Sequence, residues 1–91
     1  MKLIQVKDKI VILDNHNHFL AEAIIYEDED LIEIKEIIIH KDGKGKLLGT
    51  KIMKILIALA KTKNKKIKPI NLYSISWFRI HKEYKEILLT N

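Results

Sequence analysis

The segment EIIIHKDGKGKLLGTK, residues 36–51, carries the strongest structural signal in this chain. It begins with an apolar run, passes through a loop containing Gly43 and Gly45, and continues into a stretch whose apolar residues recur at helical spacing. A strand, a glycine-containing loop and a helix are therefore predicted in succession. The unpaired amides at such a helix start suit an anion such as a pyrophosphate. Neither the Walker nor the dinucleotide spacing is present, and a loop before an ordinary basic helix explains the pattern equally well.

Upstream of this segment, short apolar runs between polar turns predict four strands, at residues 3–6, 10–13, 19–26 and 31–40. In the fourth strand Ile32 and Ile34 alternate with charged residues, and Glu36 then lands on the face that the two isoleucines occupy. A β-bulge near Lys35 and Glu36 would restore the alternation of inward and outward side chains along the strand. Alternatively, the strand becomes buried on both faces from this point. The short turns between these strands predict antiparallel pairing.

Downstream, the periodicity predicts a long helix over about residues 46–63 and a short strand at 67–71, where Pro69 suggests a sheet edge or a bulge. Ser74 or Ser76 is expected to cap a second helix that runs to about residue 84, and residues 87–89 can form a last short strand. The order is β-β-β-β-α-β-α. This order predicts an α/β (α+β) fold with helices packed on a mixed sheet.

Composition narrows the class of protein. With 91 residues, 47% of them hydrophobic and 32% charged, we expect one domain over residues 1–91. The absence of cysteine excludes disulfides, thiolate zinc sites and a cysteine nucleophile. The longest apolar run, residues 55–60, is far shorter than the roughly 18 residues of a membrane-spanning helix. Because the first residues also lack a signal-peptide pattern, we expect a cytoplasmic protein without membrane contact.

Charge is distributed unevenly along the chain. Residues 1–45 carry 6 lysines against 10 carboxylates, a net charge of −4, whereas residues 46–91 carry 11 basic residues against 2 glutamates, a net charge of +9. This asymmetry suggests an anionic partner for the second half, either a phosphorylated cofactor or a nucleic acid. A compositional bias toward lysine and isoleucine explains it equally well. His16 and His18 lie close together in a turn without further ligands, so we expect no metal site.

Over residues 19–88 the chain resembles the small, standalone GNAT acetyltransferase-like proteins of bacteria. The resemblance rests on the order and spacing of short elements, and no gap is needed from Ile32 to Ile52. The matching elements are Ala21-Glu22, Ile32-Glu33-Ile34, the glycine-turn segment KGKLLGTKI at 44–52, the strand segment KIKPINLY at 66–73, and HKEY at 81–84.

The resemblance implies a GNAT-like sheet with a parallel strand pair at a splay that binds acetyl-CoA or CoA. It implies that backbone of Ile37, Ile38 and Ile39 holds the pantetheine arm. The residues implied around the pyrophosphate are Lys44, Gly45, Lys46, Leu48, Gly49 and Thr50. Asn71, at the family's cysteine position, completes the implied cofactor set.

Three positions depart from the family pattern: Leu47 replaces the middle glycine of the turn, Glu36-Ile37 replaces a His-Thr pair, and Asn71 replaces the cysteine. Direct transfer of an acetyl group to an amine needs a base for the ammonium and an acid for the leaving thiolate. Glu36 is the candidate base and Tyr73 the candidate acid. The alternatives are an ordinary exposed strand residue for Glu36 and a core aromatic for Tyr73.

We therefore expect an acetyl-CoA-dependent N-acetyltransferase-like protein acting on an unidentified amine. A non-catalytic module that binds CoA or a peptide is the first alternative, favoured by Leu47 and Asn71. A basic nucleic-acid-binding domain is the second, although no RNP-like aromatic pair or helix-turn-helix pattern supports it. The acceptor and the oligomeric state are left open.

Overall fold

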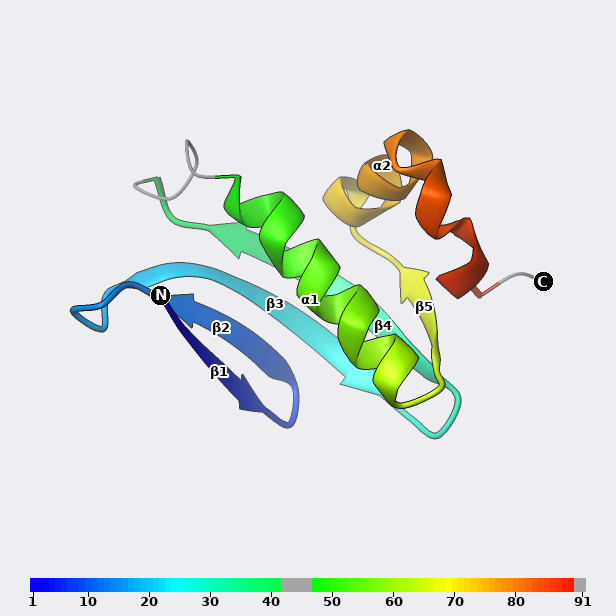
Figure 1. Cartoon of the computed structure of the whole chain (residues 1–91), viewed down its shortest axis with the longest axis horizontal. Coiled ribbons are helices and arrows are strands. Elements are labelled where there is room, and N and C mark those ends of the chain that lie inside the picture. The colour runs from blue at the N-terminus through cyan, green and yellow to red at the C-terminus, as the bar shows by residue number, and fades with distance from the viewer. Residues whose placement is uncertain (42–46, 90–91) are drawn as a thin grey trace.

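The computed structural model describes residues 1–41 and 47–89. Five strands form one mixed sheet in the order β1-β2-β3-β4-β5 (Figure 1). The first four strands pair antiparallel, and β4 pairs with β5 in parallel. The strands are β1 (Lys2–Val6), β2 (Lys9–Leu13), β3 (Phe19–Glu27), β4 (Leu31–Ile39) and β5 (Lys66–Pro69).

Helix α1 (Leu48–Thr62) lies across one face of the sheet, and α2 (Leu72–Ile80) lies beside it, followed by the 3-10 helix η2 (Lys82–Ile87) (Figure 1). The predicted mixed sheet with packed helices is confirmed. The shortest dimension of the molecule, 18 Å, has room for one sheet layer and one helix layer. No described element covers the second face of the sheet. No helix in the described part of the chain is long and apolar enough to cross a membrane.

The core lies between α1 and the sheet face beneath it. Cross-strand partners share a face, so Ala21 and Ala23 of β3 lie beside Ile12 and Ile10 of β2, and all four are buried. Ile32 and Ile34 of β4 extend this row toward β5. Helix α1 and the α2 region complete the core with Leu48, Ile52, Met53, Leu56, Ile57, Ala60, Trp77 and Phe78.

The predicted bulge in β4 is confirmed. Ile25 of β3 pairs with Ile34 and Ile24 with Glu36, so Lys35 is the extra residue. The bulge returns Ile37 and Ile39 to the helix-covered face and turns Glu36 to the open face. It also marks the point where β4 and β5 separate, because their pairing ends with Ile34 and Pro69.

Several predicted boundaries are wrong. The second helix begins at Leu72 with Asn71 as its N-cap, so neither Ser74 nor Ser76 caps it. It ends at Ile80, before the expected residue 84, and the chain continues as η2. The expected last strand is reduced to one parallel bridge between Leu88 and Ile67. Pro69 lies on a true edge strand, as its presence suggested.

Candidate functional site

The separation of β4 from β5 leaves one edge of β4 open. The His40 amide donates to the Leu20 carbonyl of β3 at 2.8 Å. Backbone groups alternate in direction along a strand, so those of Ile39 and Ile37 point away from β3, toward the side where β5 has ended. Ile38 points its backbone groups toward β3. Among the described residues no strand pairs with this edge beyond Ile34.

The carbonyl of Ile34 closes the splay at its narrow end. It accepts the amides of Ile70 at 3.0 Å and Asn71 at 3.4 Å, which ends the parallel ladder and turns the chain into α2. The Asn71 side-chain oxygen accepts a hydrogen bond from the buried Ser74 hydroxyl. Asn71 therefore lies at the splay, with its side chain engaged in shaping the start of α2.

Helix α1 begins beside the open edge of β4. Leu47 precedes its first turn with φ 56° and ψ 31°, a left-handed conformation that glycine adopts without strain. The first intrahelical bond runs from the Lys51 amide to the Leu47 carbonyl at 3.1 Å, so the amides of Leu48, Gly49 and Thr50 have no partner within the helix. No acidic residue lies in this first turn and no described side chain caps it. The first turn therefore has three amides without an intrahelical partner, at the positive end of the helix dipole.

Tyr73 of α2 packs directly against this first turn. A methyl group built at Gly49 would overlap the Tyr73 hydroxyl, and it would lie 2.7 Å from Tyr73 Cζ and 3.1 Å from Ile39 Cδ1. Only a residue without a side chain lets the ring approach α1 this closely. Partial burial raises the pKa of the Tyr73 phenol, and a hydrogen bond with Thr50 lowers it by less. The phenol is therefore protonated at neutral pH.

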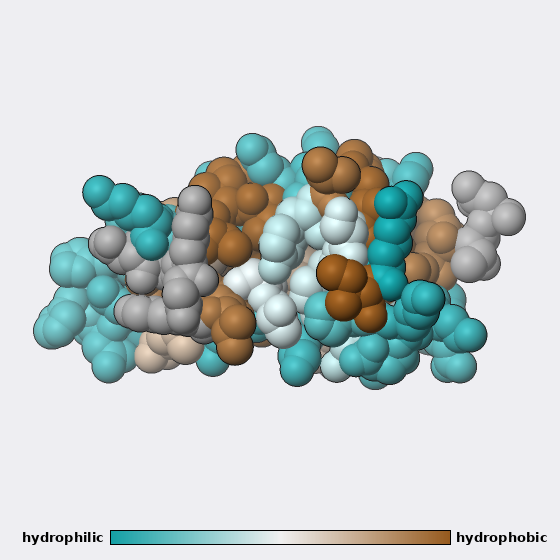
Figure 2. Space-filling view, turned by 90° about the horizontal axis from the view of Figure 1, so that it is seen from above, coloured by the Kyte–Doolittle hydropathy of each residue, from teal (hydrophilic) through white to brown (hydrophobic). Residues whose placement is uncertain are grey.

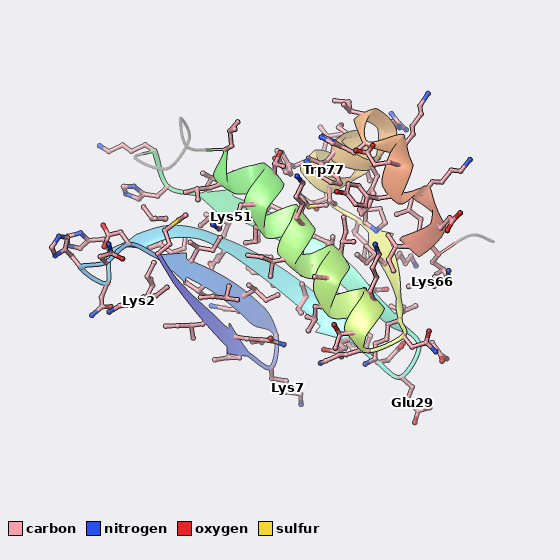
Figure 3. All side chains as sticks on the ribbon, viewed as in Figure 1. Lys2, Lys7, Glu29, Lys51, Lys66 and Trp77 are labelled. Carbon is pink, nitrogen blue, oxygen red and sulfur yellow. The ribbon has the colours of Figure 1, made fainter. Side chains whose placement is uncertain are left out.

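Trp77 of α2 forms a hydrogen bond with the same turn of α1. Its indole Nε1 donates to Thr50 Oγ1 at 3.1 Å, and the residue is 4% exposed. Figure 3 shows Trp77 between α1 and α2, with Lys51 on the opposite side of α1. The His81 ring stacks on the indole at 3.8 Å between centroids, and Tyr84 stacks at 5.6 Å. Nothing in the local sequence pattern around Trp77 shows that it reaches Thr50, 27 residues earlier in the chain.

Two open depressions, each of about 490 Å³, lie on the described surface. One adjoins the α1 start and is lined by Met1, Leu47, Thr50, Lys51, Lys54, Ile55 and Ala58. The other lies around the turn from β3 to β4, away from the splay, and includes Glu27, which is already paired with Lys63 and Lys65. Figure 2 views the molecule from above Figure 1, the long side on which α1 begins and α2 lies; hydrophobic groups there flank a paler central band.

Most of the described residues that the sequence analysis predicted for the cofactor site or for catalysis lie close together in the structure. Ile39, Gly49 and Tyr73 are in contact, and Leu48, Thr50 and Asn71 lie on the elements that surround them. Glu36 is separate: it pairs with Ile24 on the uncovered face of the sheet and is exposed. Lys44, Gly45 and Lys46 lie outside the described residues. Within 1–41 and 47–89, no three side chains of the metal-binding types converge.

Comparison with solved structures finds the NMR solution structure of a "GCN5-like putative N-acetyltransferase" from Staphylococcus aureus, with a TM-score of 0.78 and 23% sequence identity. The similarity covers 99% of this chain and 89% of that chain. It shows that the chain has a GNAT-like fold, as the resemblance implied. No protein-family model matches the sequence, and no curated protein matches it.

Proposed function

We propose that the chain binds acetyl-CoA in the splay between β4 and β5 and transfers the acetyl group directly to an amine. The open edge of β4 carries this proposal. Pantetheine contains two amide groups, and an extended amide chain can bind a free sheet edge as an added strand does. Ile37 and Ile39 offer the outward backbone groups for such pairing. The lack of any described strand on this edge beyond Ile34 supports it.

The start of α1 is the proposed pyrophosphate site. The amides of Leu48, Gly49 and Thr50, which have no partner within the helix, lie on the element next to this edge, and helix dipoles favour anions at this end. Leu47, where the resembling family has the middle glycine of its turn, has a left-handed backbone conformation that glycine adopts without strain. Lys44, Gly45 and Lys46, just before it, are proposed to complete the site.

Tyr73 and Glu36 are the proposed proton carriers. When the amine nitrogen attacks the acetyl carbonyl, the carbon–sulfur bond breaks and the departing thiolate needs a proton. A protonated Tyr73 at the splay can donate it, and its raised pKa keeps that proton available at neutral pH. Glu36 lies on the other face of the sheet, so it is proposed to take the proton of an amine that approaches from that face, directly or through water.

One observation favours a second candidate function, a CoA-binding module without catalysis. Glu36 and Tyr73 lie on opposite faces of the sheet, and the Asn71 side chain is occupied by Ser74. The transferase and the module share the same cofactor site. If the chain is a transferase, Glu36→Gln should lower turnover while leaving affinity for acetyl-CoA intact. If it is a module, the wild type should bind acetyl-CoA without turnover.

Calorimetric titration with acetyl-CoA and with CoA tests the shared site. Ile39→Pro removes the outward amide of Ile39 without removing a bond to β3, whereas Ile39→Ala is a matched control that loses side-chain packing and keeps the amide. We expect Ile39→Pro to weaken binding at least tenfold relative to Ile39→Ala. On α1, Gly49→Glu places a carboxylate at the proposed pyrophosphate site. Gly49→Gln meets the same overlap with Tyr73 without the charge and is the steric control, and Thr62→Glu places the same charge at the far end of the helix as the charge control.

Each variant is first compared with the wild type by circular dichroism, so that a loss of binding is read only from folded protein. Absence of binding by the wild-type chain at millimolar acetyl-CoA and CoA would refute both the transferase and the module. Binding that salt abolishes, and that Gly49→Glu and Thr62→Glu weaken alike, would indicate nonspecific attraction of an anion to a basic chain.

A further inference from the structure

The two edges of the sheet are built differently. At the β5 edge, Leu88 forms a bridge with Ile67, and the Leu89 amide donates to the Ile67 carbonyl at 2.9 Å. The same strand carries Lys66, Lys68 and Pro69. Cover by another segment, charged side chains and proline are the usual means of preventing an edge strand from pairing with another chain. The β5 edge is therefore protected.

The β1 edge lacks this protection among the described residues. All five residues of β1 are exposed, with Leu3 53%, Ile4 44% and Val6 50% accessible. Its pairing with β2 is regular, without a bulge, and it contains no proline. The only charged residue within it is Lys2, and Lys7 follows it directly; Figure 3 shows these two at its ends. Such a regular, exposed and mostly apolar edge is a template for another strand.

The backbone groups that face outward can be identified. The two-residue turn Lys7-Asp8 joins β1 to β2, and Val6 pairs with Lys9 across it. The closing pair of such a hairpin is hydrogen bonded, so the groups of Val6, Ile4 and Lys2 face β2. Leu3 and Gln5 therefore present their amides and carbonyls at the free edge. The Lys2 ammonium donates to Asn17 Oδ1 at 2.6 Å and is engaged within its own chain.

We infer that β1 pairs antiparallel with β1 of a second copy, about a two-fold axis at Ile4. Leu3 of each copy then exchanges two hydrogen bonds with Gln5 of the other, and the two Ile4 side chains meet across the axis. Lys2 lies opposite Val6, so within β1 no like charges face each other. This register uses both outward residues of each copy, which makes the edge complementary to itself.

The resulting assembly is one continuous sheet made of two five-stranded sheets. Ile4 and Val6 lie on the uncovered face beside Val11 of β2, so pairing joins the apolar rows of the two copies. A contact built around one strand is small compared with stable protein interfaces. The dimer is therefore weak, and its population depends on protein concentration.

Cross-linking tests the register directly, because the chain contains no native cysteine. In a non-hydrogen-bonded antiparallel pair the two Cα atoms lie about 4.5 Å apart, which is within disulfide range. We expect Ile4→Cys to form a disulfide-linked dimer under mild oxidation at least ~10-fold faster than Gln5→Cys or Val11→Cys, whose sulfurs do not meet across the axis. Equal rates for the three variants would overturn the proposed pairing.

Sedimentation of the cysteine-free chain gives an independent test, over concentrations from low micromolar to near millimolar. Gln5→Pro removes an outward amide that β2 does not use, and proline is tolerated at such an edge position. We expect a monomer–dimer equilibrium in the wild type and a monomer throughout in Gln5→Pro. A wild type that stays monomeric would refute the dimer. A dimer that Gln5→Pro leaves intact would show that another surface, such as the uncovered sheet face, forms the contact.

Discussion

The hydroxyl of Tyr73 lies against the Cα of Gly49, so that the first turn of α1 and the first turn of α2 meet without an intervening side chain. The two residues are 24 positions apart in the sequence, and each belongs to a helix with its own packing. Their contact brings a phenol to the helix start proposed to bind a pyrophosphate. The geometry of the candidate site therefore depends on the absence of a Cβ at residue 49.

Gly49→Ala is expected to displace Tyr73 while leaving the protein folded. Alanine is favoured over glycine by up to about 1 kcal/mol inside a helix and by less in the first turn, which offsets part of the cost of moving the ring. The free energy of unfolding should change little, whereas affinity for acetyl-CoA should fall. In a Tyr73→Ala background the same substitution should stabilise the protein by up to about 1 kcal/mol. Equal effects of Gly49→Ala in both backgrounds, measured by urea denaturation, would show that the two residues do not interact.

Leu47→Gly is expected to stabilise the chain relative to Leu47→Ala. Leu47 is 77% exposed, so little packing is lost in either variant. Its left-handed backbone costs a residue with a Cβ about 1–2 kcal/mol, and glycine avoids that cost, although the larger entropy of glycine in the unfolded chain offsets part of the gain. We expect the glycine variant to be the more stable by about 1 kcal/mol in urea denaturation. Equal stability of the two variants would mean that the left-handed turn stores no strain.

Thr50→Val is expected to destabilise the protein through Trp77. Valine has nearly the shape of threonine but leaves the buried indole N–H without its acceptor, at a cost of about 1–3 kcal/mol. Thr50→Ser keeps the hydroxyl and serves as the matched control. Because Trp77 is the single tryptophan, its emission reports both the unfolding transition and the change in its surroundings. A valine variant as stable as the serine variant would show that this hydrogen bond contributes nothing to stability.

Short apolar runs between polar turns predicted the first four strands, and the break in alternation at Glu36 located the bulge in the fourth, because both signals are carried by neighbouring residues. The face on which Glu36 points could not be deduced without that bulge, since one extra residue exchanges the two faces of a strand. The alternation also did not predict that Glu36 and Tyr73 lie on opposite sides of the sheet.

The ends of the helices and the long-range contacts were harder to predict from the sequence. The second helix was expected to run past His81, because its helical pattern continues into Tyr84; in the structure His81 instead stacks on Trp77 and the chain tightens into η2. The Tyr73–Gly49 and Trp77–Thr50 contacts depend on how α2 docks against α1. Their sequence separations leave no local periodicity from which to predict them.

Acid is expected to release the link between β3 and the region after α1. Glu27 lies 2.9 Å from Lys63 Nζ and also pairs with Lys65, and hydrogen bonds to Lys65 and Lys63 lower the pKa of its carboxyl. A carboxyl whose pKa is lower in the folded state contributes stability at neutral pH that is lost as pH falls below about 4. The wild type should therefore lose stability in acid more steeply than Glu27→Gln. Glu29→Gln, an exposed change in the same turn, is the control and should follow the wild type.

Alkali is expected to destabilise the chain through Tyr73. Burial raises the pKa of this phenol, with the hydrogen bond to Thr50 acting against it, so the folded state holds the proton more tightly than the unfolded state. Stability from this difference is complete below the unfolded pKa, near 10, and is lost as pH rises through the folded pKa. In a pH titration followed by tyrosinate absorbance, one component should titrate above the ordinary tyrosine pKa. Tyr73→Phe should remove this component, and Tyr26→Phe, the control at an exposed site, should retain it. If Tyr26→Phe removed that component and Tyr73→Phe did not, the phenol at Gly49 would be no more sheltered than a surface tyrosine.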